Sequence, residues 1–263
     1  MRRLFATPLL ALTLLLTTLS PAAAITNGHA DGNDHPYVAL LTDGNFICSG
    51  ALLSDKVILT AAHCFSQKPS TLGRAPDGAP IVQASFTPDR ASFDYRGAYY
   101  WHPDFCLRCG KGLSGFDRHD IALIILESPV PTSAVDQYGE LADRGSVEDL
   151  PSHQKLDLVG FGVQAVDGDG TVRSSDSVSR QAVETWMMNA SGKISKEFIK
   201  VSASKGGACF GDSGGPNLLA GTETIIAINS FVTSQQCDGS SYSNRVDTRS
   251  NRGWILDTID KHD

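Results

Sequence analysis

The sequence predicts an all-β fold, on three observations. Short runs of apolar residues, or of alternating apolar and polar residues, recur along the chain. Clusters of Gly, Pro, Asn and Asp separate these runs at short intervals. The second half of the chain shows the same pattern of runs and clusters as the first. With 263 residues, of which 41 % are hydrophobic and 19 % charged, the chain has ample material for a buried core. A sandwich or barrel of short strands is therefore expected.

The first 24 residues form a separate segment. Arg2 and Arg3 precede an apolar run, Leu9–Leu19, and small residues follow up to Ala24. This order is typical of a secretory signal peptide cleaved after Ala24, and the run is too short to span a bilayer comfortably. We expect a secreted, extracellular protein whose mature chain begins at Ile25. An uncleaved anchor and a twin-arginine signal are the weaker alternatives.

The strands of the first half are expected between residues 25 and 132. A polar stretch, Pro129–Ser146, is then predicted to be a linker that crosses the surface. The predicted strands are Tyr37–Leu41, Phe46–Leu53, Val57–Ala61, Ile81–Phe86 and Ile121–Leu126.

The second half, residues 133–263, is expected to hold five more strands and one helix. Its last segment, Gly253–Lys261, carries apolar residues at a spacing compatible with a short terminal helix. The predicted strands are Leu156–Val163, Arg180–Met187, Glu197–Ala203, Asn217–Ala220 and Glu223–Val232.

The net charge and the cysteine content narrow the range of possible functions. Loss of residues 1–24 removes two arginines and no acid, which moves the formal net charge from −7 to −9. An acidic protein argues against nucleic acid or an anionic membrane as a partner. Six cysteines in an exported chain indicate disulfides, with 15 possible pairings. They are Cys48, Cys64, Cys106, Cys109, Cys209 and Cys237.

The close pair Cys106 and Cys109 has the spacing of a redox motif or of half a zinc site. A zinc site would need a second pair or histidines in a suitable pattern, and none is convincing. A small local disulfide is the better interpretation. We expect neither a metal nor another cofactor.

The segment Gly211–Pro216 carries the most specific chemistry. Ser213 lies among glycines, which permit backbone angles and close approaches that side chains forbid. The backbone N–H groups of Gly211 and Ser213 could then hold a developing negative oxygen. A serine hydroxyl is a weak nucleophile, so it needs a base that a third group orients.

The chain supplies both partners upstream. His63 ends an apolar run among small residues, and Asp120 opens the apolar run 121–126. A carboxylate there would be partly desolvated and could accept the imidazole N–H, which fixes the tautomer. Each residue alone is weak evidence, since many strands begin with Asp. The other histidines have no comparable setting.

The segments Thr60–Cys64, Asp120–Leu123 and Gly211–Pro216 together resemble the trypsin/chymotrypsin family of serine proteases, in that family's order His, Asp, Ser. The resemblance extends from Ile25 to the terminal helix. It implies two six-stranded antiparallel Greek-key β-barrels, residues 25–132 and 133–263, with a short C-terminal helix. It also implies a monomeric endopeptidase that acts on protein or peptide substrates and that a proteinaceous inhibitor could block.

The resemblance assigns roles to individual residues. His63 would be the general base and then the general acid, Asp120 would orient it, and Ser213 would form an acyl-enzyme. Gly211 and Ser213 would form the oxyanion hole. Ser230 matches a serine that supports the aspartate.

The cysteines follow the family in part. The pairs Cys48–Cys64 and Cys209–Cys237 match family disulfides, whereas Cys106–Cys109 does not. This extra pair lies in a longer loop, roughly residues 106–116, that we expect to narrow the non-primed side of the cleft.

The family's N-terminal switch has a counterpart here. A free α-amino group at Ile25 would fold in and pair with Asp212. Since the predicted signal-peptide cut would itself free Ile25, we expect activity on export without a zymogen stage.

The resemblance also predicts the substrate pocket. Gly207 occupies the floor position, where a trypsin-like specificity for Arg or Lys would need Asp. Val232 would shorten the pocket and Ser241 would form the opposite wall, which favours small or medium apolar P1 residues, as in elastase. Preference for aromatic P1 residues, as in chymotrypsin, is the alternative. The remaining predicted lining residues are Ala208, Phe210, Ser230 and Phe231.

Two other functions are alternatives. The pattern Gly211-x-Ser213-x-Gly215 also fits the nucleophile elbow of α/β-hydrolases, but that fold needs its acid and histidine after the serine, and only His262 follows. A non-catalytic binding protein on a protease fold is the second alternative. Such proteins commonly lack a triad member, and this chain has all three.

Overall fold

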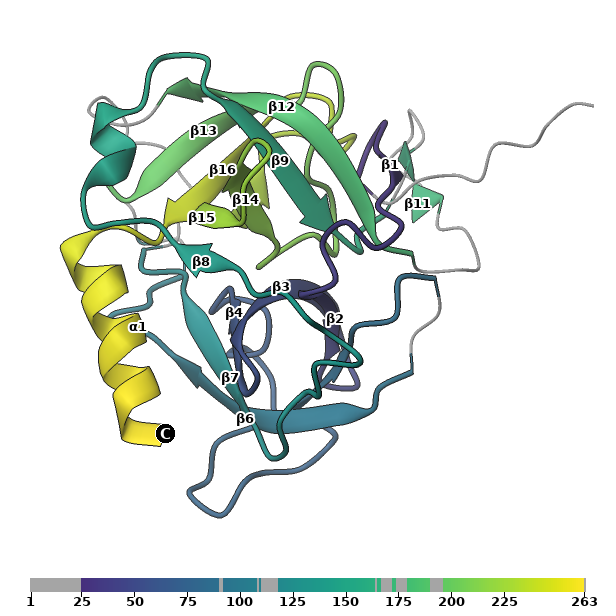
Figure 1. The fold of residues 1–263 in the computed structure, drawn as a ribbon, viewed down its shortest axis with the longest axis vertical. Helices are drawn as coiled ribbons and strands as arrows, with labels where there is room; N and C mark the ends of the chain where they lie inside the picture. Colours follow the sequence, from purple (N-terminus) through teal and green to yellow (C-terminus); the bar gives the residue numbers. More distant parts are fainter. Residues whose placement is uncertain are drawn as a thin grey trace, which may run out of the picture.

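A computed structural model gives the fold of the chain (Figure 1). The predicted signal peptide, and residues 108 and 110–116 of the predicted loop, lie outside the described residues. The described residues are 25–89, 92–107, 109, 118–163, 165–166, 172–173, 179–189 and 196–262.

The N-terminal half closes into a six-stranded antiparallel barrel in the order β2-β3-β4-β7-β6-β5, with β5 pairing back onto β2. Apolar residues alternate or run continuously along these strands, so one face of each covers a common core. The strands are β2 (Val38–Thr42), β3 (Ile47–Ser54), β4 (Val57–Thr60), β5 (Ile81–Ser85), β6 (Tyr95–Trp101) and β7 (Ala122–Leu126).

The C-terminal half forms a second six-stranded barrel in the order β12-β13-β16-β15-β14-β9, which closes because β12 also pairs with β9. Figure 1 shows this barrel packed directly against the first. Its strands are β9 (Lys155–Gly160), β12 (Gln181–Asn189), β13 (Phe198–Ser202), β14 (Pro216–Leu219), β15 (Thr224–Val232) and β16 (Ser240–Arg245).

Short elements join and flank the barrels. The strand β1 (His29–Ala30) pairs with β12, and β8 (Glu140–Leu141) runs parallel to β15. The helix α1 (Arg249–His262) ends the chain and lies against β7 of the first barrel (Figure 1). The others are a 3₁₀ turn, η1 (Ser146–Asp149), and a hairpin of β10 (Ala165–Val166) and β11 (Val172–Arg173).

The predicted all-β fold of two barrels and a terminal helix is confirmed, and the differences concern single elements. The barrel strands β6 and β16 and the two-residue strands β1, β8, β10 and β11 were not predicted. The helix α1 begins at Arg249, four residues earlier than expected. The stretch Pro129–Ser146 is not simply a surface linker, because Val130 and Val135 are buried in it and β8 forms there.

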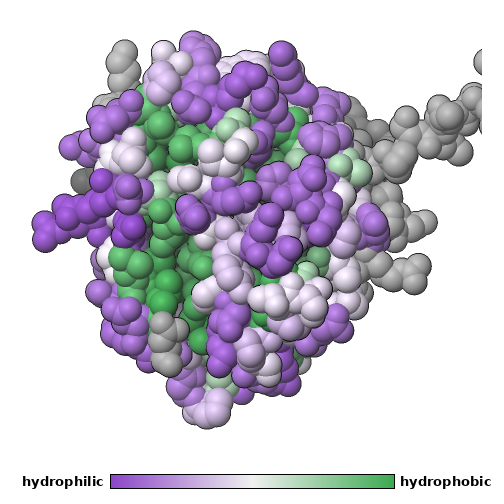
Figure 2. All heavy atoms as spheres, in the orientation of Figure 1, coloured by the Kyte–Doolittle hydropathy of each residue, from purple (hydrophilic) through white to green (hydrophobic). Residues whose placement is uncertain are grey.

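One cluster of buried apolar side chains runs through both barrels, so they share a core. On the face drawn in Figure 2, hydrophobic residues also reach the surface in a band across both barrels, bordered by hydrophilic ones. Among the residues described, no helix is long and apolar enough to cross a membrane.

Candidate active site

Residues far apart in the sequence meet between the barrels. His63 lies on the turn after β4, Asp120 lies just before β7, and Ser213 lies on the loop between β13 and β14. His63 and Ser213 line one cavity of about 250 Å³. The first barrel thus supplies the acid and the imidazole, and the second supplies the serine.

The carboxylate of Asp120 is fully buried and accepts three hydrogen bonds. The His63 backbone N–H donates to Oδ1 over 2.7 Å, and His63 Nδ1 lies 2.7 Å from Oδ2. Ser230 Oγ, on the second barrel, donates to Oδ2 over 2.5 Å. An Nδ1–H bonded to this carboxylate leaves Nε2 as the ring's acceptor, which is the tautomer a general base needs.

Burial alone would raise the pKa of Asp120. The opposing charge of His63, its hydrogen bonds and that of Ser230 outweigh burial and hold the pKa below its ordinary value. The acid therefore stays ionised beside the imidazole.

The turns that carry the pair are tied to their surroundings. Tyr99 donates from its hydroxyl to the carbonyl oxygens of Ala61 and Ala62, 2.8 Å from each. Before Asp120, His119 adopts a φ of 50°, and its Nδ1 lies 3.0 Å from Asn251 Oδ1 on α1. The terminal helix therefore helps to place Asp120.

The loop around Ser213 depends on its glycines. Gly211 has a φ of 96° and Gly214 a φ of 78°, which side chains rarely tolerate, and a Cβ on Gly214 would collide with Thr60 Oγ1. Within the described part of the chain, no acceptor lies opposite the N–H of Gly211 or of Ser213. Both donors are therefore available to a substrate carbonyl oxygen.

Ser49 on β3 was not predicted as a site residue, yet it supports this loop. Its Oγ donates to the Gly211 carbonyl over 3.0 Å and accepts the Phe161 N–H over 3.0 Å, while its N–H donates to the Ser213 carbonyl over 2.8 Å. A serine within a strand gives no signal in the sequence, because its partners come from another barrel.

Asp212 is the second buried acid. Its carboxylate accepts the N–H of Gly162 over 2.8 Å and of Cys209 over 2.9 Å. A Cβ on Gly162 would lie 2.5 Å from the Asp212 Cγ, so glycine leaves the room that the acid occupies. No cation among the described residues lies within ion-pair distance, and burial raises the pKa of Asp212 to about 7.

The segment that would carry the activating amine is already inserted. The side chain of Ile25 is fully buried, and the backbone of Thr26 exchanges two hydrogen bonds of 3.1 Å with Gly207. In the described chain Ile25 is still joined to residue 24, so the predicted pair of Ile25 with Asp212 stays a prediction.

Most predicted pocket residues line the cavity with His63 and Ser213. Val232 on β15 is the cross-strand partner of Ser241 on β16. Asn229 also lines the cavity and was not predicted. Gly207 is not among the lining residues, and its missing Cβ would point at Ala203. The predicted residues brought together are Ala208, Phe210, Ser230, Phe231, Val232 and Ser241.

A second cavity, of about 510 Å³, shares Phe210 with the first and is also lined by Gly211. Its opposite wall is the β2–β3 hairpin, which exposes about two-fifths of Phe46 and of Ile47. The buried Asp43 accepts the N–H groups of residues 45 and 46, which holds the hairpin in shape.

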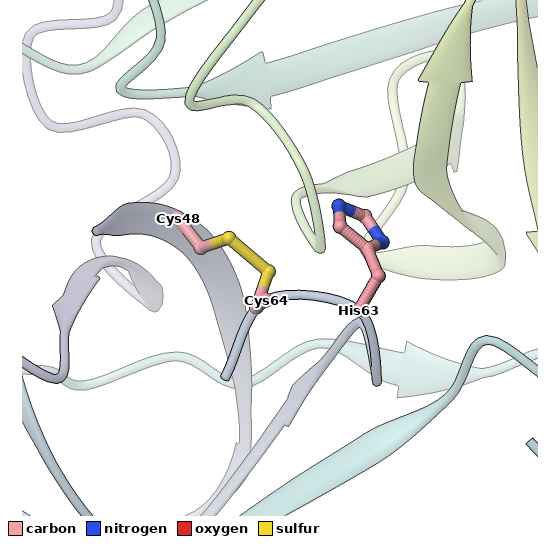
Figure 3. A group of neighbouring side chains, drawn as sticks. All are labelled: Cys48, His63 and Cys64. Carbon is pink, nitrogen blue, oxygen red and sulfur yellow. A yellow bond between two sulfur atoms is a disulfide. The ribbon is translucent and has the colours of Figure 1, made fainter. Parts of the chain in front are cut away.

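Cys48, His63 and Cys64 lie close enough to suggest a metal site, but the two sulfurs are bonded to each other, so they offer no thiolate ligand. Figure 3 shows this disulfide joining β3 to the turn from which the His63 ring projects. The other disulfides are Cys106–Cys109 and Cys209–Cys237.

Comparison with known proteins decides the family. The family model described as Trypsin matches residues 25–255. The chain belongs to the trypsin family of serine proteases. Granzyme M of Homo sapiens is 28 % identical over 78 % of this chain and 76 % of its own length, and Trypsin of Saccharopolyspora erythraea is 28 % identical over 78 % and 85 %.

A solved structure described as HL collagenase has the same fold. It matches this trypsin-family chain with a TM-score of 0.69 at 23 % identity, and covers 89 % of this chain and 98 % of its own. The predicted family and fold are therefore confirmed.

Replacement of Ser49 tests its support of the nucleophile loop. We expect Ser49→Ala to lower kcat about tenfold with little change in KM, because a loss of about 1–3 kcal/mol in buried hydrogen bonding loosens the Gly211 peptide. The measurement is steady-state kinetics on a peptide substrate. Ser54→Ala, at the end of the same strand, is the control and should leave kcat unchanged. An unchanged kcat in Ser49→Ala would contradict this role.

The pKa of Asp212 predicts how the stability of the uncleaved chain depends on pH. A folded-state pKa of about 7, above the ordinary 3.8, means that the acid's contribution is fully present below pH 4 and is lost as pH rises through 7. In a Ser213→Ala background, the free energy of unfolding of the full chain should therefore fall over that range. Asp212→Asn should remove the fall, and an equally steep fall in that variant would contradict the assignment.

Proposed function

We propose that this protein is a secreted serine endopeptidase that hydrolyses peptide bonds through Ser213, His63 and Asp120. The observation that supports this most is the buried Asp120 carboxylate bonded to His63 Nδ1, with the imidazole and Ser213 lining one cavity. The substrates are proteins or peptides, and a proteinaceous inhibitor could occupy the same cleft of the monomer.

The reaction follows from these positions. His63 Nε2 takes the Ser213 proton as Oγ attacks the substrate carbonyl carbon, and the Asp120 charge stabilises the imidazolium. The carbonyl oxygen, now negative, accepts the N–H groups of Gly211 and Ser213. His63 then gives its proton to the leaving amine, and water repeats the sequence on the acyl-enzyme.

A catalytically inert binding protein on the same fold is the alternative, and covalent labelling separates the two. We expect a fluorophosphonate probe to label Ser213 in the mature chain, because only an activated serine attacks phosphorus readily. Peptide mapping by mass spectrometry locates the label. Ser213→Ala should show none and His63→Ala very little. A mature chain that binds peptides but stays unlabelled would favour the binding protein.

We propose that the enzyme prefers small or medium apolar P1 residues over Arg, Lys and large aromatic residues. None of the described residues that line the cavity is acidic, and the branched side chain of Val232 lines it together with Ser241, the cross-strand partner of Val232. Ala208 and Phe231, which also line the cavity, are apolar and favour an apolar P1 side chain.

Replacement of Val232 tests the preference. Val232→Gly should raise kcat/KM for Phe and Tyr at P1 relative to Ala about tenfold or more, since a missing side chain of this size changes discrimination by about 1–3 kcal/mol. A peptide library that varies only P1 gives the ratio, and Val163→Ala at the second cavity is the control. An unchanged ratio would argue against this wall.

We also propose that export activates the protein. Cleavage after Ala24 would give Ile25, whose side chain is buried, a free amine, and Asp212 has no cationic partner among the described residues. The ion pair would keep Asp212 charged and shape the loop that carries Gly211 and Ser213. The proposed cellular location is therefore extracellular.

A further inference from the structure

The guanidinium of Arg180, the residue just before β12, is fully buried, and it takes no part in the proposed reaction. Its Nε donates to Asp31 Oδ2 over 2.7 Å, and the Arg180 carbonyl accepts the Asp31 N–H over 3.1 Å. Asp31 is itself buried, and its other oxygen lies 2.5 Å from His35 Nδ1. A buried charged pair of this kind holds only when each partner is placed accurately.

The remaining donors of Arg180 reach backbone oxygens of the first barrel and of the N-terminal segment. One terminal nitrogen donates to Val38 at 3.1 Å, where β2 begins, and to Phe86 at 3.3 Å, just after β5. The other donates to Gly32 at 3.3 Å and to the Asn33 side chain at 3.2 Å. One side chain on the second barrel thus fixes the first barrel and residues 31–33.

Residues 25–31 lie along the second barrel between two fixed points. Thr26 pairs with Gly207 near the site, and His29 pairs with Ala182 on β12 (Figure 1). Asp31 is the next fixed residue, and Arg180 holds it. The segment that leads to Ile25 is therefore ordered from its anchored end.

We propose that Arg180 and Asp31 form a clamp that holds the N-terminal segment so that the freed amine of Ile25 lies against Asp212. This inference rests on the activation of the enzyme by the freed Ile25. Ordering the backbone of a loose end costs conformational entropy, which would oppose its insertion. A clamp six residues away pre-orders the segment. Arg180 and Asp31 are thus positioning residues that act on Ser213 through Ile25 and Asp212.

A purely structural role for Arg180 would have different consequences. Arg245, on β16 of the same barrel, is equally buried and also pairs with a buried acid, with Nε and a terminal nitrogen each 2.8 Å from the Asp247 carboxylate. None of its described partners lies in residues 25–36. Arg245→Met is therefore a matched control: it removes a buried guanidinium and leaves the N-terminal segment alone.

The test uses the mature chain that begins at Ile25, with Arg180→Met, Asp31→Asn and Arg245→Met. The first readout is the rate at which isotope-labelled acetic anhydride acetylates the Ile25 amine, followed by mass spectrometry against a free Ile-Thr-Asn-Gly peptide. The second readout is the fraction of molecules that a fluorophosphonate labels at Ser213. Asp31→Asn keeps the size of the side chain and a hydrogen-bond acceptor. This variant therefore tests the clamp even if Arg180→Met does not fold.

We expect the amine of the unmodified enzyme to react much more slowly than the peptide. Arg180→Met and Asp31→Asn should raise that rate about tenfold or more, as a loss of about 1.4 kcal/mol in holding the end would. They should also lower the labelled fraction and kcat without a matching change in KM. Arg245→Met should lower the unfolding midpoint and leave the amine protected.

The other outcomes separate the two proposals. If the amine of the unmodified enzyme reacts as fast as the peptide, activation through Ile25 fails and the clamp with it. If that amine is protected and stays so in Arg180→Met and Asp31→Asn, activation stands and the clamp is overturned. The clamp would also be overturned if the amine reacted as fast in Arg245→Met as in Arg180→Met. Faster acetylation would then follow from the loss of stability alone.

Discussion

The buried carboxylate of Asp120 is the constraint on which the rest of this structure depends. A carboxylate without solvent is costly unless donors surround it. The donors come from both barrels: His63 from the first and Ser230 from the second. Docking of the barrels therefore completes the set of donors around Asp120, and the same docking brings Ser213 to the cavity that His63 lines. The geometry of the candidate site and the packing of the barrels are thus established together.

Asp212 shows the opposite electrostatic outcome in an equally buried place. It has two backbone donors and no described cation, so burial dominates and raises its pKa to about 7, whereas the pKa of Asp120 is lowered. Two acids whose pKa values move apart have different tasks. The unmet charge of Asp212 favours arrival of a cation, and the Arg180–Asp31 contact holds the chain end that could supply it.

The sequence alone was sufficient to predict the candidate site residues and the strands whose local residue pattern is distinctive. The glycines around Ser213, and Asp120 at the mouth of an apolar strand, predicted the site, and the runs of apolar residues predicted most strands. Strand β16 was missed because it is a polar run, Ser-Ser-Tyr-Ser-Asn-Arg, that is buried throughout. Some of its polar groups bond to residues distant in the sequence: Ser243 Oγ donates to the side-chain oxygens of Asn217 and Asn229. Ser49 and Arg180 were missed for the same reason.

Within three residues, strand β15 contributes both to the hydrogen bonds of Asp120 and to the cavity. Ser230 donates to Asp120, and Val232, two residues later, lines the cavity together with its cross-strand partner Ser241. The pairing of β15 with β16 shifts register between Asn229 and Phe231, so the ladder is irregular at Ser230, which both bonds Asp120 and lines the cavity. Val232 lies beyond this irregularity. We therefore expect a change at Val232 to alter the cavity while the Ser230 hydrogen bond persists.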